Sequence, residues 1–135
     1  MSITRDVDPA EGPDPDARLA VLDPKALAGL RELDPTGSGR LVARIVQAYV
    51  ATAERLLPQL REASAGGDLN AVRHVAHTLK SSSASLGATD LSARCAAVEA
   101  MARQQQTEGL RPAVDGLCRE LRAVLRALGQ LPDAA

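Results

Sequence analysis

The sequence predicts an all-α protein, an up-down-up-down antiparallel four-helix bundle with a short additional N-terminal helix. Its 135 residues fit a single domain. The 25 alanines and 19 leucines outnumber the 10 valines and 2 isoleucines, and this mixture favours helix. Tyr49 is the only aromatic residue, whereas sheet proteins normally draw on aromatic and β-branched side chains. Four amphipathic stretches joined by short breaks then indicate the bundle.

Residues 1–20 are expected to form a disordered tail, because they combine three prolines and five acidic residues with few large apolar side chains. The first signal for a helix is Asp23-Pro24, since aspartate is a good N-cap and proline is favoured at the first helical position. This short helix should end at Asp34-Pro35, because a residue that precedes proline avoids the α region. We expect it to cover one end of the bundle.

A long second helix is expected over residues 40–63. Pro58 lies inside it and should kink it one turn before its end, and Gly66-Gly67 should end it. Its apolar stripe has the spacing of one helix face and comprises Leu41, Ile45, Tyr49, Leu56 and Leu60, widened by Val42 and Val46.

A third helix is expected over residues 69–86, with Asp68 as its cap and Gly87 just beyond its end. Its core positions alternate in steps of three and four, as in an antiparallel bundle; they are Leu69, Val72, Ala76, Leu79, Ser83 and Leu86.

The fourth helix should be capped by Thr89 or Asp90 and end in the polar run 104–106. A last helix should begin between residues 107 and 112 and end at Gly129.

The bulk properties exclude several classes of protein. A net charge of −1 and the lack of aromatic stacking platforms argue against a nucleic-acid binder. The sequence contains no apolar run of about 18 residues, so no membrane span is predicted. The N-terminus lacks the apolar region of a secretory signal. Cys95 and Cys118 are therefore expected to be buried, reduced thiols. We expect a cytoplasmic monomer.

Of the two histidines in the sequence, His74 and His77, His77 has the more unusual neighbourhood. It should lie on the exposed side of the third helix, with Lys80 three residues later, Ser81 four residues later and Arg73 four residues earlier, all on one face. Ser81 and Ala84 are small and leave open space around the imidazole. A nucleophilic histidine beside cations, with little steric cover, is suited to meet an anion.

Other interpretations of the histidines compete with this one. A surface histidine taken at random usually has no role. His74 and His77 are spaced to share a metal, but no carboxylate or thiol lies beside them on the helix, and a site needs three or four ligands. No strand-to-helix serine elbow indicates a hydrolase, since Ser81, Ser82 and Ser83 lie within a helix.

The segment AHTLKSSSASLGA over residues 76–88 resembles the signature of histidine-containing phosphotransfer (HPt) domains. That signature is His-x-Leu-Lys-Gly-Ser-Ser followed by Leu-Gly-Ala. The likeness continues into the next helix, where such domains often carry leucine, cysteine, an apolar residue and glutamate, here Leu91, Cys95, Val98 and Glu99. It covers about residues 21–130, and we expect the HPt bundle over residues 21–131.

The resemblance implies a phosphorelay intermediate rather than an enzyme with autokinase or ATPase activity. His77 would accept a phosphoryl group, through Nε2, from the aspartyl phosphate of one receiver domain and pass it to another, and Lys80 would stabilise the phosphoryl charge. The partners would be receiver domains of response regulators and of a hybrid sensor histidine kinase. The chain would carry no cofactor of its own, because the Mg²⁺ belongs to the receiver domain.

Ser81 departs from the family pattern, which usually has glycine there. That position must stay small for a receiver to approach. The small residues Ser81 and Ala84, together with the cation Arg73 on the same face, are therefore candidates for partner docking. Two alternatives stay open: a phosphorylation-incompetent HPt-like module that binds receivers or kinases as an adaptor or inhibitor, and an unrelated helical adaptor. The partner that orients the imidazole is also open, with Thr89 and Glu99 in the relevant region.

Overall fold

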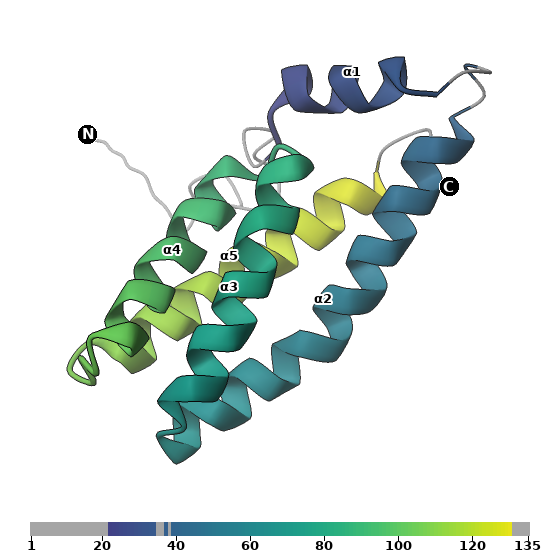
Figure 1. Cartoon of the computed structure of the whole chain (residues 1–135). Coiled ribbons are helices and arrows are strands. Elements are labelled where there is room, and N and C mark those ends of the chain that lie inside the picture. The colour runs from purple at the N-terminus through teal and green to yellow at the C-terminus, as the bar shows by residue number, and fades with distance from the viewer. Residues whose placement is uncertain (1–21, 35–36, 38, 131–135) are drawn as a thin grey trace, which may run out of the picture.

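The computed structural model describes residues 22–34, 37 and 39–130, and the expected tail over residues 1–20 lies outside this part. The described residues form helices and no strand. The helices are α1 (Pro24–Glu32), α2 (Arg40–Gly66), α3 (Leu69–Ser85), α4 (Thr89–Arg103) and α5 (Leu110–Gly129) (Figure 1).

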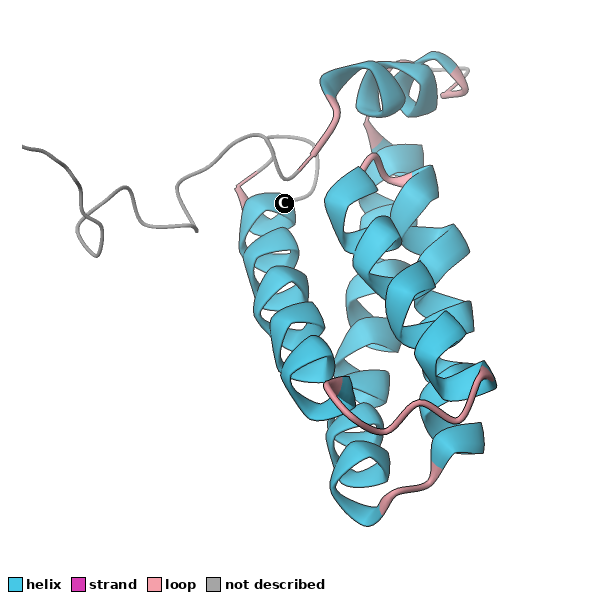
Figure 2. Ribbon diagram, turned by 90° about the vertical axis from the view of Figure 1, so that its left-hand side faces the viewer, coloured by secondary structure: helices cyan, strands magenta, loops and turns pink. Residues whose placement is uncertain are grey.

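The four long helices form an antiparallel bundle in which each packs on its neighbours in a ring: α2 on α3, α3 on α4, α4 on α5, and α5 back on α2. Helices α3 and α4 make the most extensive contact. Helix α1 lies across one end of the bundle (Figure 2), where it buries Leu27. The predicted all-α bundle with an additional N-terminal helix is confirmed.

Local signals set most helix ends as predicted. The Asp23 side chain accepts a hydrogen bond from the backbone N–H of Lys25, and Asp68 accepts one from Ala71. Helix α2 continues through Pro58 to Gly66, and Figure 1 shows it bending along this part of its length. Gly67 then adopts a left-handed conformation with φ of +73°, which ends the helix.

The turn between α3 and α4 depends on Gly87, whose φ is +82°. The backbone N–H of Asp23 donates to its carbonyl oxygen at 2.7 Å. A Cβ at this position would lie 2.9 Å from the carbonyl oxygen of Asp23. The absence of a side chain therefore lets the start of α1 rest directly on this turn.

Two details of the sequence prediction are wrong. The N-cap of α4 is Ala88, with no side-chain cap, and Thr89 is already helical. Ala88 is fully buried beside the turn on which α1 rests, so packing selects a small residue there over a polar cap. In α2 the most buried stripe runs through Val42 and Val46, while Leu41 and Ile45 are only partly buried.

Leucine, valine and alanine dominate the core, and the single tyrosine joins it. The Tyr49 hydroxyl and the Ser83 hydroxyl are 2.8 Å apart and hydrogen-bonded. Burial raises the pKa of Tyr49 to about 12. Cys95 and Cys118 are free and buried, as predicted. Within the described part of the chain, no helix has the length and apolar character needed to cross a membrane.

Candidate functional site

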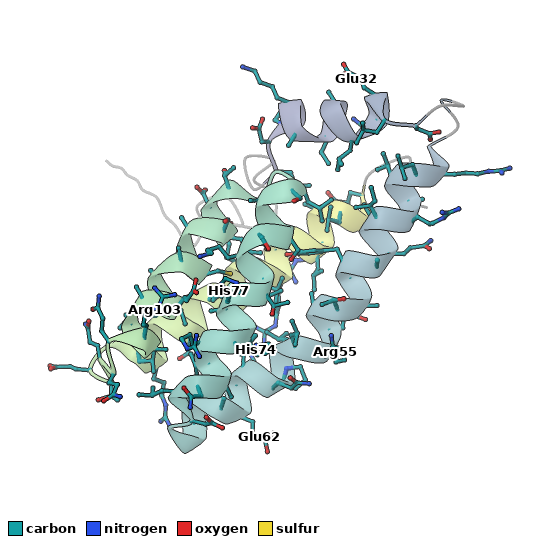
Figure 3. The ribbon with its side chains drawn as sticks, viewed as in Figure 1. Glu32, Arg55, Glu62, His74, His77 and Arg103 are labelled. Atoms are coloured by element: carbon teal, nitrogen blue, oxygen red, sulfur yellow. The ribbon has the colours of Figure 1, made fainter. Side chains whose placement is uncertain are left out.

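His77 lies near the middle of α3 with its side chain 65% exposed (Figure 3). The core face of α3 is formed by apolar side chains such as Val72 and Leu79, both fully buried. His77 is off that face, so the periodicity that buries the leucine and valine presents the imidazole to solvent. The predicted exposure of His77 is confirmed.

The imidazole is held by a carboxylate from the neighbouring helix. Nδ1 of His77 lies 2.8 Å from Oε2 of Glu99, a residue of α4 whose side chain is only 3% exposed. A carboxylate can only accept, so Nδ1 carries the proton and donates it to Glu99. The neutral ring therefore has its lone pair on Nε2, and none of the described residues hydrogen-bonds that nitrogen. The ring is oriented at one nitrogen and open at the other.

Glu99 is the centre of the cluster. Its Oε1 receives the Lys80 ammonium at 2.7 Å, and its Oε2 receives the Arg103 guanidinium at 2.8 Å in addition to His77. The hydrogen bond from Lys80 lowers the pKa of Glu99 to about 2, against the opposing effect of burial and with a further lowering from His77. Glu99 is thus ionised and charge-compensated although it is buried.

The close packing of α3 on α4 brings these groups together. The Ser92 hydroxyl of α4 donates to the carbonyl oxygen of Lys80 at 2.9 Å, which ties α4 to the backbone turn that carries the site. Cys95, one helical turn before Glu99, is fully buried at the same seam. Small side chains here let the two helix backbones approach, so that a glutamate from α4 reaches the imidazole of α3.

Burial also makes Cys95 chemically inert. Removal from water raises the pKa of its thiol to about 12, and the nearby carboxylate of Glu99 adds to the increase. The thiolate is therefore disfavoured in the folded protein, and Cys95 acts as a core residue.

The structure modifies the prediction for Lys80. The sequence predicts an exposed ammonium beside His77. The Lys80 side chain is instead only 36% exposed, and its ammonium is bound to Glu99. The other predicted docking residues, Arg73, Ser81 and Ala84, are exposed on α3, and none of them belongs to the Glu99 cluster. No described residue hydrogen-bonds the Ser81 hydroxyl, so Ser81 adds only its small bulk beside the ring.

The resemblance predicts Glu99 only as one of two candidates for orienting the imidazole, and no sequence pattern predicts Arg103. One signal was available: Glu99 lies in the apolar stripe of α4, directly after Val98, where a carboxylate is buried and needs cations. Arg103 follows four residues later, the spacing of a helical ion pair. Thr89, the other candidate for orienting the ring, is exposed and takes no part.

His74, the second histidine, is exposed one turn before His77 and does not join the cluster (Figure 3). Its backbone carbonyl accepts a hydrogen bond from the Thr78 hydroxyl. Within residues 22–34, 37 and 39–130, no three histidine, cysteine, aspartate or glutamate side chains gather in a way that could hold a metal ion.

An apolar groove of about 370 Å³ runs between α2 and α3. Thr78, Ser82 and Ser85 form its α3 side. Since these residues lie beside the exposed face of α3, the groove and the imidazole open on neighbouring surfaces of the bundle. The α2 side consists of Ile45, Ala48, Tyr49 and Thr52, and Leu86 completes the lining.

Comparison with protein families finds a match. The family model described as Hpt domain matches residues 44–131, more than half of the chain and including the whole His77 cluster. Neither the search of curated proteins nor the search of solved structures finds a match.

Proposed function

The chain belongs to the Hpt domain family, and on that basis we propose that it is a phosphorelay intermediate in which His77 carries the phosphoryl group. His77 accepts it from the aspartyl phosphate of one receiver domain and passes it to the aspartate of another. One observation carries the assignment: the imidazole is exposed, its Nδ1–H is bound to a buried carboxylate, and its Nε2 is open.

The transfer is balanced by groups present in the two proteins. The lone pair of Nε2 forms the N–P bond while the O–P bond of the aspartyl phosphate breaks and its electron pair leaves with the aspartate carboxylate. The ring becomes positively charged while Nδ1 keeps its proton, and Glu99 stabilises that charge, as a carboxylate does for a catalytic imidazolium. Lys80, three residues after His77 on α3, is the cation that offsets the negative charge of the phosphoryl group. The Mg²⁺ that this step requires is supplied by the receiver domain.

The surroundings of His77 support a receiver domain as the partner. The ring lies on an exposed face of α3, where Ser81 and Ala84 are small and leave it sterically uncovered and where Arg73 adds a positive charge. The groove between α2 and α3 extends this surface with apolar groups. The donors and acceptors that we propose are receiver domains of a hybrid sensor histidine kinase and of response regulators, and the protein acts as a cytoplasmic monomer without autokinase or ATPase activity.

The test is phosphorylation by a panel of phosphorylated receiver domains, with detection of acid-labile, base-stable phosphate. The wild type and a His74→Gln control should take up label, and His77→Gln should take up none. Label that persists in His77→Gln would overturn the assignment. Binding of receivers without transfer to the wild type would instead support a phosphorylation-incompetent adaptor.

A further inference from the structure

The three partners of Glu99 are divided unequally between its two oxygens. Lys80 alone occupies Oε1, at 2.7 Å, whereas His77 and Arg103 share Oε2, each at 2.8 Å. The hydrogen bond that orients the imidazole is therefore independent of the one that holds Lys80. Lys80 can leave its oxygen without releasing the ring.

A phosphoryl group on Nε2 competes with Glu99 for Lys80. The Lys80 side chain is 36% exposed and carries its ammonium on a flexible stem three residues after His77, so the ammonium can turn toward a dianionic phosphoryl group. Glu99 is only 3% exposed and would then depend on its remaining partners. A buried carboxylate is unfavourable without enough counter-charge, so a second cation that stays on Glu99, beside the His77 ring, favours the turn of Lys80.

We propose that Arg103 is this second cation, a positioning residue that keeps Glu99 charge-paired while Lys80 transfers to the phosphoryl group. Its side chain is 61% exposed, and its guanidinium contacts only the Glu99 oxygen that Lys80 does not use. It therefore pairs with Glu99 in both states. In the unphosphorylated protein Glu99 holds Lys80, and phosphorylation of His77 redistributes the two cations between two anions.

This inference rests on the proposed phospho-acceptor role of His77, and its test does not need a receiver domain. Phosphoramidate, a small phosphoryl donor, transfers its phosphoryl group to imidazole nitrogen and releases ammonia. In a His74→Gln background His77 is the only histidine, so label on the protein reports that ring alone. The chain has two lysines, and Lys25 is exposed on α1, so selective lysine labelling gives one NMR signal from the site and one reference.

Phosphorylation should shift the side-chain signal of Lys80 and leave that of Lys25 in place. Arg103→Gln should reduce the Lys80 shift and slow His77 phosphorylation about fivefold, the effect of losing one partly exposed charge-assisted contact. Arg103→Lys should restore both. Arg94→Gln, which removes an arginine of α4 near Glu120 instead, is the matched control and should change neither.

An unchanged Lys80 signal on phosphorylation of the parent protein would overturn the proposal. So would an Arg103→Gln variant with the parent rate and shift, or an Arg103→Lys variant as impaired as the glutamine. Failure of every receiver domain to transfer phosphate, with the Lys80 shift intact under phosphoramidate, would reject the proposed function and leave the redistribution of cations standing.

Discussion

Replacing Glu99 with glutamine isolates the effect of its charge on phosphoryl transfer. The amide keeps the size of the side chain and an oxygen that can accept from Nδ1 of His77, but it removes the negative charge that faces the ring at 2.8 Å. Attack by Nε2 makes the ring positive, so the variant loses an attraction that grows as the reaction proceeds.

The geometry sets the size of this loss. Two unit charges about 4 Å apart attract by about 1 kcal/mol in water and by about 4 kcal/mol at an effective dielectric constant near 20. The His77 side chain is 65% exposed and the Glu99 side chain 3% exposed, so we take a value between these limits, about 2 kcal/mol. That corresponds to a phosphorylation rate about 30-fold slower.

The assay is the single-turnover rate of phosphorylation of His77 by a phosphorylated receiver domain and, separately, by phosphoramidate. Glu120→Gln is the matched control, since it neutralises another buried glutamate, on α5 and outside the His77 cluster. Circular dichroism checks that both variants are folded. A folded Glu99→Gln variant whose rates lie within about twofold of the wild type would refute the electrostatic role of Glu99.

Three further predictions concern stability and ionisation. Because the pKa of Glu99 is lowered to about 2 from 4.5, its ionisation stabilises the fold above pH 4.5, and this is lost as the pH falls toward 2. As the pH is lowered over this range, the urea midpoint of unfolding should therefore fall more steeply for the wild type than for Glu99→Gln. Parallel plots of midpoint against pH for the two proteins would contradict this. Because the pKa of Tyr49 is raised to about 12 from 10.0, its stabilising contribution is complete below pH 10 and is lost as the pH rises through 12. An ultraviolet titration should find no phenolate near pH 10 in the folded protein. Ionisation of Tyr49 at that pH would contradict its burial in the core. Gly87→Ala places a Cβ 2.9 Å from the Asp23 carbonyl oxygen at a φ of +82°, so unfolding should become easier by about 2 kcal/mol. Gly29→Ala, in open space on α1, should be neutral or slightly stabilising, and equal effects of the two alanines would contradict the steric argument.

The helices could be predicted because their ends are determined locally. Asp23, Pro24 and Asp68 act within one turn of their own position, and Gly87 adopts the backbone conformation that its residue type permits. The cap of α4 could not be predicted in this way. Ala88 is fully buried, and the turn before it is held by a hydrogen bond from Asp23 to Gly87, residues more than 60 positions apart, which no local pattern contains.

The candidate site also has one part that local sequence predicts and one part that depends on contacts between distant residues. The exposed face that carries His77 and Lys80 follows from the 3.6-residue period of one helix. The cluster that orients the ring joins His77 to Glu99, 22 residues away on another helix, and depends on the register in which α4 packs on α3. Contacts such as the hydrogen bond from Ser92 to the carbonyl oxygen of Lys80 fix that register. The ion pair between Lys80 and Glu99 therefore could not be predicted from the sequence of α3 alone.

The near-absence of aromatic residues, with Tyr49 as the only one, bears directly on how the site works. An exposed histidine normally samples several rotamers and both tautomers, and a buried one cannot reach a partner. The bundle separates these two requirements by leaving the His77 ring in solvent and burying its anchor, Glu99, on the adjacent helix. This is possible only where two helix backbones lie close together, which the small side chains of Ser92 and Cys95 allow. We expect a bulky ring at either position to push α3 and α4 apart and to break the hydrogen bond between Glu99 and Nδ1 of His77.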